Sequence, residues 1–567
     1  MPCDVNGGGG PTVKPVAPQN SFLRPEAWAK YLSDDADREF LLEGVYNGFH
    51  IVDSTDFVPA EMENYQSATA GSCRDKVEET IREEITEGRY VVVRDKPCIV
   101  SALGAIPKES GSVRLIHDGS RPVGRALNDY AALDAKQRFQ TLDDAADILS
   151  KDAYMAKVDL QKAYRSVRTH PSNWPACGLK WRFKGDNQAS YMVDTALPFG
   201  SRHAPGIFHR LTQAVRRFMA KLGFTGLVVY LDDFLIIEKS RERCQLALDT
   251  LIGLLRELGF SISWHKVEGP RRKIVFLGVE IDSVAGCMQL PPDKLLEFRQ
   301  LILATLGQKR ISLRQLQHLA GKLNWASSVV RGGRIYLRRI LDLMKPLAFS
   351  HHKALIPLSV HLDLMWWKDY LEVFNGKSWL CGYKRWVNVY VDACGRGAGI
   401  VWGNDWYYVN WELDMPHVAP KHINVKETIA IGLAVARWAP MWSGCSVTIH
   451  TDNITALCAL NKGRSKSPLG MQVVRNIFWL SAAFDFTIRG AHVPGVQNQA
   501  ADAVSRLHSP GSLQSLEYIF SEASALISFC CPFYFMCHMS YASFLFLSLQ
   551  ITRWLLTWRS WMLWQGG

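Results

Sequence analysis

The pattern of apolar and polar positions divides the chain into regions of different character. Between residues 66 and 285, β-rich runs such as "RYVVVRDKP" and "KIVFLGVEID" alternate with longer stretches such as "APGIFHRLTQAVRRFMAKLG". In the longer stretches apolar residues recur three and four positions apart, which predicts amphipathic helices, whereas the runs of β-branched residues predict strands. We therefore expect residues 66–285 to form one α+β domain.

The residues before this domain show two other patterns. Residues 1–20 are rich in glycine and proline, and we expect them to be disordered. Residues 21–65 contain a helix-like segment that ends in a turn at Asn47 and Gly48. This segment predicts a small N-terminal helical element.

Further regions follow the α+β domain. Residues 286–345 show no β alternation and are predicted to be mostly helical, and residues 346–385 are expected to be a connection. Within residues 386–508, "WVNVYVDACGRGAGIVWG" predicts a hairpin of two strands, "NVKETIAIGLAVARWA" predicts a helix, and "SVTIHTDN" predicts another strand. This last region is expected to be a second α/β domain.

The tail, residues 509–567, is abruptly apolar, aromatic and rich in cysteine. It is long enough to span a bilayer, so a membrane anchor has to be considered. Pro532 and His538 interrupt the apolar run, and the composition changes sharply after the preceding domain. We therefore favour translation through an intron or past a disrupted reading frame as the origin of the tail, and we do not expect a membrane partner.

The overall composition narrows the classes of partner. The chain has 567 residues, 65 Lys and Arg against 54 Asp and Glu, and a formal net charge of +11. This balance favours a polyanionic partner, although solubility alone would also explain it. The 13 cysteines show no paired C-x-x-C spacing, which indicates a reducing, intracellular compartment. No compact basic tract distinguishes the nucleus from the cytoplasm.

The run "VVYLDDFLII" places two carboxylates, Asp232 and Asp233, inside an apolar stretch. Adjacent charges of one sign repel each other and are costly to bury, so a bound cation would explain the pair. Asp is also common in turns, and the pair between two strands would fit a hairpin turn without any metal. The ten residues alone leave both interpretations open.

A two-metal site for phosphoryl transfer needs carboxylates from more than one strand, around ions about 3.5–4 Å apart. Asp159 in "AKVDLQKAYRSV" is a candidate for the third carboxylate, because it follows an apolar run and stands just before a polar turn. In isolation, Asp159 would equally fit the N-cap of a helix. The candidate site therefore consists of Asp159, Asp232 and Asp233.

The order of the motifs resembles the palm of reverse transcriptases. It comprises Asp159, Tyr164, "LPFGSRHAPGIF" at 197–208, "YLDD" at 230–233 and "VFLG" at 275–278, the last in the position of the primer grip. Upstream, "AIPKESGSVRLIHDGSRPVGRALND" resembles the fingers. The resemblance implies a right-hand polymerase with fingers, palm and a thumb at 286–345, in which the three Asp residues hold two Mg²⁺ ions. Mn²⁺ is also possible, because both ions accept oxygen ligands.

The same resemblance implies further roles. Lys108 and Arg114 would clamp the triphosphate of the incoming nucleotide, Tyr164 would exclude a 2′-hydroxyl, Phe199, Gly200 and Pro205 would form the floor beneath the template base, and Lys266 would protonate pyrophosphate. In the thumb, Arg331, Arg334, Arg338 and Arg339 would face duplex phosphates. A core tyrosine, a solvated lysine and solvated helix charges are the ordinary alternatives for Tyr164, Lys266 and these arginines.

The second α/β domain repeats the carboxylate pattern. Asp392, Glu427, Asp452 and Asp502 follow each other in an order that, with the Gly-rich hairpin after the first, resembles ribonuclease H. This resemblance implies four carboxylates that hold two Mg²⁺ ions and cut the RNA strand of an RNA–DNA hybrid. Asn453 directly follows Asp452, and His492 precedes the last Asp, but we assign no proton-transfer role to His492.

The whole arrangement resembles retrotransposons of the DIRS type more than gypsy-like elements, on motifs such as "KLNWASSVVRGGRIYLRRI" and "AHVPGVQNQAADAVSR". The fold expected is an α+β multidomain chain, a polymerase followed by an α/β ribonuclease H-like domain. The resemblance implies an RNA-directed DNA polymerase whose partners are an RNA template, a DNA primer, the RNA–DNA hybrid, dNTPs and a separate tyrosine recombinase. The alternative is an inactive genomic relic that binds primer-template without catalysis.

Overall fold

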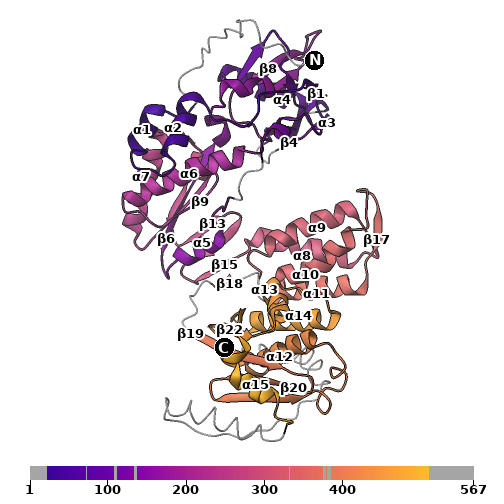
Figure 1. The fold of residues 1–567 in the computed structure, drawn as a ribbon. Coiled ribbons are helices and arrows are strands. Elements are labelled where there is room, and N and C mark those ends of the chain that lie inside the picture. Colours follow the sequence, from indigo (N-terminus) through magenta and orange to yellow (C-terminus); the bar gives the residue numbers. More distant parts are fainter. Residues whose placement is uncertain are drawn as a thin grey trace, which may run out of the picture. The chain divides into compact units, whose positions relative to one another are not determined.

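The computed structural model describes residues 22–71, 73–107, 111–132, 137–330, 332–373, 378–379, 385–484 and 486–509. The chain divides into two compact units, residues 1–286 and 287–567 (Figure 1). The predicted disordered N-terminus lies outside the described residues, as does the predicted apolar tail apart from Ser509. None of the helices in the described part of the chain combines the length and apolar character that a bilayer span requires.

A five-stranded sheet lies at the centre of the first unit. Its strands are β6 (Tyr154–Gln161), β9 (Leu227–Tyr230), β10 (Asp233–Glu238), β11 (Ser261–Ile262) and β12 (Glu268–Arg271). β10 pairs antiparallel with both β9 and β6, and β6 pairs on its other edge with β11 and β12. The predicted hairpin around Asp232 is therefore β9–β10, and it sits beside the strand that carries Asp159.

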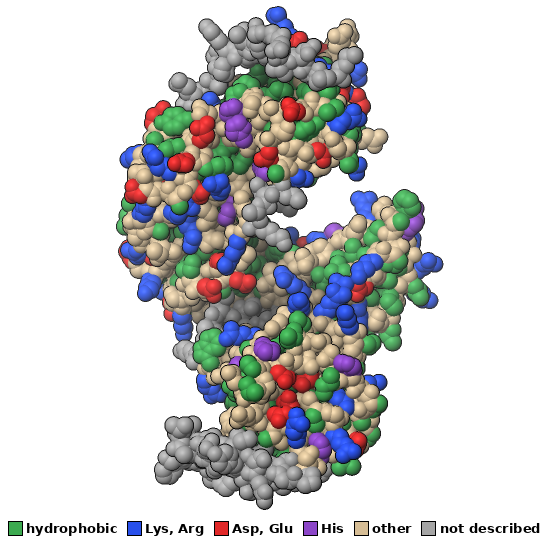
Figure 2. Space-filling model, in the orientation of Figure 1, with side chains coloured by type: hydrophobic (Ala, Val, Ile, Leu, Met, Phe, Trp, Pro, Cys, Tyr) green, Lys and Arg blue, Asp and Glu red, His purple; other side chains and the backbone are tan. Residues whose placement is uncertain are grey.

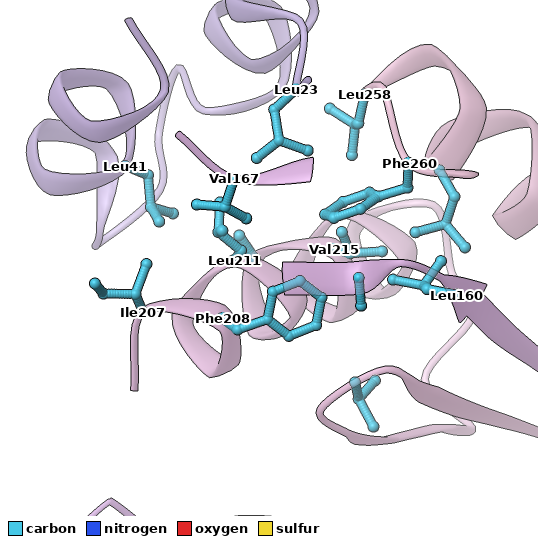
Figure 3. Packing of buried hydrophobic residues seen from close by; sticks show 14 of the residues in the cluster. Leu23, Leu41, Leu160, Val167, Ile207, Phe208, Leu211, Val215, Leu258 and Phe260 are labelled. Atoms are coloured by element: carbon cyan, nitrogen blue, oxygen red, sulfur yellow. The ribbon is translucent and has the colours of Figure 1, made fainter. Parts of the chain in front are cut away.

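Two long helices, α6 (Ala204–Lys221) and α7 (Arg241–Glu257), pack against this sheet. Phe208, Leu211 and Val215 recur three and four positions apart along α6, so they share one helix face. Figure 3 shows these side chains meeting Leu160 of β6 and Phe260 in the buried core. Burying an apolar side chain of this size contributes about 1.5–3 kcal/mol, so this layer is a rigid support for the strands.

The remainder of the first unit includes a second sheet whose buried residues form a separate core. Its elements are α1 (Pro25–Tyr31), α2 (Arg38–Asn47), β1 (Ala60–Glu61), α3 (Gln66–Thr69), α4 (Cys73–Thr86), β2 (Tyr90–Val93), β3 (Ile99–Val100), β4 (Leu103–Pro107), β5 (Val113–His117), α5 (Leu142–Ile148), β7 (Gly178–Trp181), β8 (Ser190–Asp194), β13 (Lys273–Phe276) and β14 (Val279–Asp282). Five of these strands form a second sheet in the order β1-β3-β7-β8-β2, and β4 pairs with β5. The helix α2 ends at Asn47, followed by Gly48 at φ +93°, where the sequence predicts a turn.

A buried ion network joins the second sheet and α4 to the segment that follows β6. The guanidinium of Arg165 donates to Glu84 of α4 at 2.9 Å and to both carboxylate oxygens of Asp194 of β8 at 2.8 Å. Arg89 also donates to Glu84, at 2.7 Å. Burial alone would raise the pKa of Glu84, but Arg165 and Arg89 outweigh it and lower the pKa to about 2.

The second unit begins with a helical layer. It contains β15 (Cys287–Gln289), α8 (Pro292–Leu306), β16 (Arg310–Ser312), α9 (Leu313–Ala326), α10 (Gly333–Met344), β17 (Lys353–Leu355), α11 (Leu358–Val373) and β18 (Ser378–Trp379). The helix α11 packs against α8 and α10. The layer therefore continues through Val373, beyond residue 345 where the sequence predicts its end, because part of the expected connection is itself the helix α11, which packs on α8 and α10.

The rest of the second unit is an α/β sheet with helices. Its elements are β19 (Arg385–Ala393), β20 (Gly397–Trp402), β21 (Asp405–Asn410), α12 (Ile423–Trp438), β22 (Cys445–Thr451), α13 (Ile454–Lys462), α14 (Pro468–Ala483), β23 (Thr487–His492) and α15 (Gln499–Ser505). The strand order is β21-β20-β19-β22-β23, antiparallel up to β19 and parallel from β19 to β23. The predicted hairpin is β19–β20.

Polar and aromatic contacts fasten the helical layer to this α/β part. Arg475 of α14 and Arg339 of α10 both bind the buried carboxylate of Asp363 of α11, at 3.3 and 3.0 Å. Beside them, Tyr336 stacks on Trp366 with ring centroids 3.7 Å apart and donates its hydroxyl to the Arg475 carbonyl. The two parts of the second unit are therefore joined by a buried contact.

We expect Glu84→Gln to destabilise the first unit by about 3–5 kcal/mol at pH 7, because it removes the buried carboxylate that Arg165 and Arg89 share and leaves part of their buried positive charge without compensation. The pKa of Glu84 is lowered in the folded state, so its contribution is present above its ordinary pKa and is lost as the pH falls toward 2. The variant should therefore lose less stability than the parent between about pH 4.5 and pH 2.

Urea unfolding followed at pH 7 and at several acidic pH values measures both effects. Glu83→Gln is the matched control, since Glu83 is the neighbouring exposed residue of α4 and lies 3.5 Å from Lys162. Equal stability of Glu84→Gln and Glu83→Gln at pH 7 would contradict the assignment.

Candidate active sites

The first candidate site lies where β6, β9 and β10 meet. Asp233 is the first residue of β10 and is directly opposite Asp159 of β6 in the antiparallel register. Asp159 therefore lies inside its strand, which continues to Gln161, rather than ending it or capping a helix as the sequence also allowed. Asp232 lies in the two-residue turn between β9 and β10, where Leu231 adopts φ +53°. A left-handed residue suits a tight hairpin but is strained without glycine.

Burial and neighbouring negative charges raise the pKa of Asp232 and of Asp233. Burial is the largest cause for Asp233, and the charges of Asp232 and Asp159 add to it, so its pKa rises to about 7. Burial also raises the pKa of Asp232, with a further contribution from Asp159. Like charges opposite each other in a sheet are destabilising. The site therefore favours a bound positive charge.

Lys266 supplies positive charge at one edge of this group. Its Nζ lies 3.0 Å from both carboxylate oxygens of Asp159. The lysine belongs to a short helical turn after β11, and about half of its side chain is exposed. The predicted proton donor thus lies within reach of the carboxylates and can also exchange with solvent.

Tyr164 and Phe199 form an aromatic pair beside the carboxylates. Their ring centroids are 5.1 Å apart, and the half-buried Tyr164 also packs on Phe208. The guanidinium of the exposed Arg114 lies over the Phe199 ring at 5.7 Å, and its charge also acts on Asp232. Arg114, Tyr164 and Phe199, which the sequence assigns to the nucleotide-binding region, therefore lie together beside the carboxylates.

Gly200 and Pro205 contribute through the backbone around this pair. Gly200 has φ +127°, and a Cβ there would meet the His117 carbonyl oxygen at 1.9 Å, so only glycine fits. The His117 amide donates to the carbonyl oxygen of Phe199 at 2.9 Å, which holds the turn in place. Pro205 lies in the first turn of α6, where its fixed φ favours helix initiation.

The remaining polymerase residues named from the sequence have mixed outcomes. Lys108 and Arg331 lie outside the described residues. Arg334 is exposed on α10, whereas Arg338 pairs with Asp342 at 3.0 Å. Arg339 is bound to the buried Asp363, so it belongs to the junction inside the second unit and not to an open basic face. Figure 2 shows other Lys and Arg side chains over the helical layer.

The second candidate site lies at one end of the sheet in the second unit. Carboxylate oxygens of Asp392 (β19), Glu427 (α12) and Asp452, which directly follows β22, all lie within 4.8 Å of one another. In the described part of the chain, this is the one group of three acidic, His or Cys residues with that spacing. Figure 2 shows acidic side chains gathered in this part of the molecule.

Glu427 is the most perturbed member of this group. Its burial, with the charge of Asp392 and a smaller contribution from Asp452, raises its pKa to about 8. The Ala393 amide and the Thr451 hydroxyl donate to its two oxygens at 3.2 and 3.3 Å, which fixes the carboxylate in place. Burial likewise raises the pKa of Asp392.

Asp502 stands apart from this group of three. It lies on α15, where its carboxylate binds Arg506 one helical turn later at 2.8 Å, although its charge still raises the pKa of Asp392. Ser505, also on α15, hydrogen-bonds Asp392. Arg506 and Ser505 were not predicted from the sequence, although the i, i+4 spacing from Asp502 to Arg506 indicates that pair.

Asn453 and His492 frame the end of the sheet. The side chain of Asn453 accepts from the Ala456 amide at 3.0 Å and so caps α13, which begins directly after it. His492 is the last residue of β23 and is paired in register with Thr451. It is therefore exposed beside the strand end that carries Asp452.

Both groups offer carboxylate oxygens and no sulfur or imidazole ligand. Oxygen-only sites of this kind suit hard divalent cations such as Mg²⁺ or Mn²⁺. Burial, with the charges of neighbouring carboxylates, raises the pKa of Asp233 and of Glu427, and a bound cation would stabilise the charged form of each. The residues present therefore fit divalent cations in both places.

Residues 106–281 match the family described as reverse transcriptase (RNA-dependent DNA polymerase). This part of the chain is therefore a reverse transcriptase domain, and the resemblance drawn from the sequence is confirmed at that level. The matched range contains Asp159, Asp232 and Asp233.

Relatives with curated descriptions are viral polyproteins. The enzymatic polyprotein of cauliflower mosaic virus (strain D/H) is 26% identical over 336 residues, which cover 55% of this chain and 45% of that protein. The genome polyprotein of petunia vein clearing virus (isolate Shepherd) is 24% identical over 389 residues, which cover 64% of this chain and 16% of that protein. The chain thus spans less than half the length of these relatives.

A solved structure of the foamy viral protease-reverse transcriptase dRH in complex with double-stranded DNA has a similar fold. The TM-score is 0.51 at 16% sequence identity, and the match covers 78% of this chain and 73% of that chain. This likeness confirms the expected polymerase-like α+β fold.

We expect Glu427→Gln to stabilise the metal-free chain at pH 8 and to reduce the stabilisation that Mg²⁺ brings. The folded-state pKa of Glu427 is raised, so ionisation costs stability, and the metal-free parent should become less stable as the pH rises from about 4.5 through 8. The amide removes this cost together with a metal ligand.

Thermal unfolding in EDTA and in Mg²⁺, from pH 5 to pH 8.5, measures both changes. Glu412→Gln is the control, because Glu412 is an exposed residue of the same α/β part. If the metal-free Glu427→Gln variant were less stable than the parent at pH 8, the expected repulsion between Glu427 and its acidic neighbours would be contradicted.

Proposed function

We propose that this chain is the RNA-directed DNA polymerase of a retrotransposon and that its second acidic group cleaves the RNA strand of the RNA–DNA hybrid. The observation that carries the first activity is the cross-strand pair Asp159–Asp233 with Asp232 in the adjoining turn, inside the reverse transcriptase domain. The polymerase reaction is attack of the primer 3′-oxygen on the α-phosphorus of a dNTP, with pyrophosphate as the leaving group.

The residues around this triad have separate roles in the proposal. Asp159, Asp232 and Asp233 would hold two divalent cations, which when bound neutralise the carboxylates and stabilise charge on the reacting phosphate. Arg114 binds the triphosphate as a cationic donor. The ring of Tyr164, held against Phe199, occupies the space that a 2′-hydroxyl would need. Lys266 donates a proton to the departing pyrophosphate.

Nucleic acid is the substrate class that fits both sites. The foamy viral relative was solved with double-stranded DNA, and the net charge of +11 favours a polyanion. The domain scheme belongs to the same proposal: fingers and palm in residues 66–285, a thumb that starts at 286 and includes α11, and a ribonuclease H-like domain in 386–508.

The second activity rests on the spacing of Asp392, Glu427 and Asp452. Asp502 joins them in the proposal through its charge at the same end of the sheet. Glu427, held by Ala393 and Thr451, orients the group, and water attacks the phosphodiester of the RNA strand. The motifs resembling DIRS-type elements lead us to propose that a separate tyrosine recombinase integrates the DNA product.

We expect the double variant Asp232→Asn/Asp233→Asn to lose dNTP incorporation on a poly(rA)/oligo(dT) primer-template in Mg²⁺, by about 1,000-fold or more, since several kcal/mol of charge stabilisation disappear. Asp249→Asn, an exposed residue of α7, is the control and should keep parental activity. A folded parent that binds primer-template without incorporation would instead support the inactive relic.

We expect Asp452→Asn to lose cleavage of labelled RNA in an RNA–DNA hybrid while it keeps dNTP incorporation. The Asp232→Asn/Asp233→Asn variant should show the reverse, because the two groups lie on different sheets. Gel analysis of the RNA strand, with Glu412→Gln as control, measures the cleavage. Parental cleavage by Asp452→Asn would contradict a nuclease role for this group.

A further inference from the structure

The sheet of the second unit has one covered face and one partly open face. Buried side chains of α12 and α14 and the packing of α13 against β23 cover the first. On the opposite face, α15 packs on β20, β21 and the end of β19, through Ala501 and Val504 against Val401. The start of β19 and the neighbouring parts of β22 and β23 on that face keep exposed side chains, among them Trp386, Asn388 and Arg489.

The strand register arranges this open face in three rows. Side chains two residues apart on a strand share a face, and the parallel pairing of β19, β22 and β23 sets them side by side. The rows are Trp386–Ser446–Thr487, Asn388–Thr448–Arg489 and Tyr390–His450–Ala491. None of these nine residues is acidic.

Contacts between the rows hold the aromatic and cationic groups in place. The guanidinium of Arg489 lies over the Trp386 ring at 5.5 Å, and its Nε donates to the Thr448 hydroxyl at 3.2 Å. The Tyr390 and His450 rings stack with centroids 4.7 Å apart, and the His450 ring is 3.0 Å from the Asn388 side-chain oxygen. The groups are therefore ordered before any ligand binds.

Trp386 is the unexplained member of this face, because 66% of it is exposed. A tryptophan that large normally buries most of its surface in a core or an interface. Its surroundings are a guanidinium, hydroxyls and an amide, so the face does not suit an apolar helix. A planar aromatic surface next to a cation and hydrogen-bonding groups suits stacked bases with a phosphate backbone.

We propose that this open face binds single-stranded nucleic acid, with a base stacked on Trp386 and the backbone phosphates at Arg489. Duplex nucleic acid is not the ligand, because its paired bases leave no face free to stack on a flat sheet. The side chains of Trp386, Asn388, Tyr390 and Asp392 lie on one face of β19. The strand therefore leads over about 20 Å from Trp386 to the acidic group, the length of about six stacked nucleotides.

This inference rests on the proposed function in two respects. The ligand is taken to be nucleic acid, and the acidic group at the end of β19 is taken to be the nuclease site. The open face would bring an unpaired strand next to Asp392, and the proposed cleavage of the hybrid alone does not require this.

The test uses the full chain and a fluorescein-labelled oligo(U) 12-mer, with an excess of unlabelled blunt primer-template duplex to occupy duplex sites. Trp386→Ala and Arg489→Ala should each weaken binding of the 12-mer by about 5- to 100-fold, as expected for loss of one stacked base. Trp386→Phe should keep most of the affinity. Tyr46→Ala, an exposed aromatic residue of α2, is the matched control and should bind like the parent.

Photocrosslinking gives the second readout. An oligonucleotide that contains 4-thiouridine should crosslink to the peptide with Trp386, and the crosslink should disappear in Trp386→Ala. Unchanged affinity in both alanine variants, or crosslinks confined to the first unit, would overturn the inference. The outcome is separate from the polymerase test, because Trp386→Ala should keep dNTP incorporation and Asp232→Asn/Asp233→Asn should keep binding of the 12-mer.

Discussion

A buried guanidinium has to be fully paired, and in the first unit this requirement fixes the frame around the candidate site of Asp159, Asp232 and Asp233. Arg165 directly follows Tyr164, and its partners Glu84 and Asp194 come from a helix and a strand far away in sequence. The pairing therefore ties α4, β8 and the end of β6 together. The strand that carries Asp159 and the ring of Tyr164 are held in fixed positions as a result. The carboxylates that Arg165 binds are those of Glu84 and Asp194 and not those of the candidate site.

In both acidic groups the fold holds carboxylates of like charge close together, but it does so in two different ways. In the first unit, antiparallel register sets Asp159 opposite Asp233, so backbone hydrogen bonds enforce the repulsion. In the second unit, a helix brings Glu427 to two strands, and backbone and hydroxyl donors hold it there. Each group has one carboxyl whose pKa is strongly raised, Asp233 in the first and Glu427 in the second. In both, burial and the neighbouring carboxylates destabilise the charged form, and the folded structure nevertheless holds the carboxyls together.

Local patterns predicted the strands on either side of Asp232 and Asp233, because the two carboxylates interrupt an apolar run at the place where the structure has the β9–β10 hairpin. What the sequence could not indicate depends on contacts between distant residues. Arg339 looks like one of several helix arginines until Asp363 and Arg475 surround it. Lys266 similarly resembles an ordinary surface lysine in the sequence, and only its contact with Asp159, 107 residues away, places it at the candidate site. The helix α11 was missed because its apolar face matches a packing surface that exists only after α8 and α10 have assembled.

The junction around Asp363 bears on which part of the second unit keeps its buried ion pairs when it is separated from the rest of the chain. Asp363 belongs to the helical layer, and one of its two guanidinium partners, Arg475, belongs to the α/β part beside the stacked Tyr336 and Trp366. A gene segment for residues 386–508 alone would carry Arg475 without its counter-ion and would leave a polar contact surface open to water. The segment that keeps these contacts intact therefore starts near residue 287, with the helical layer included.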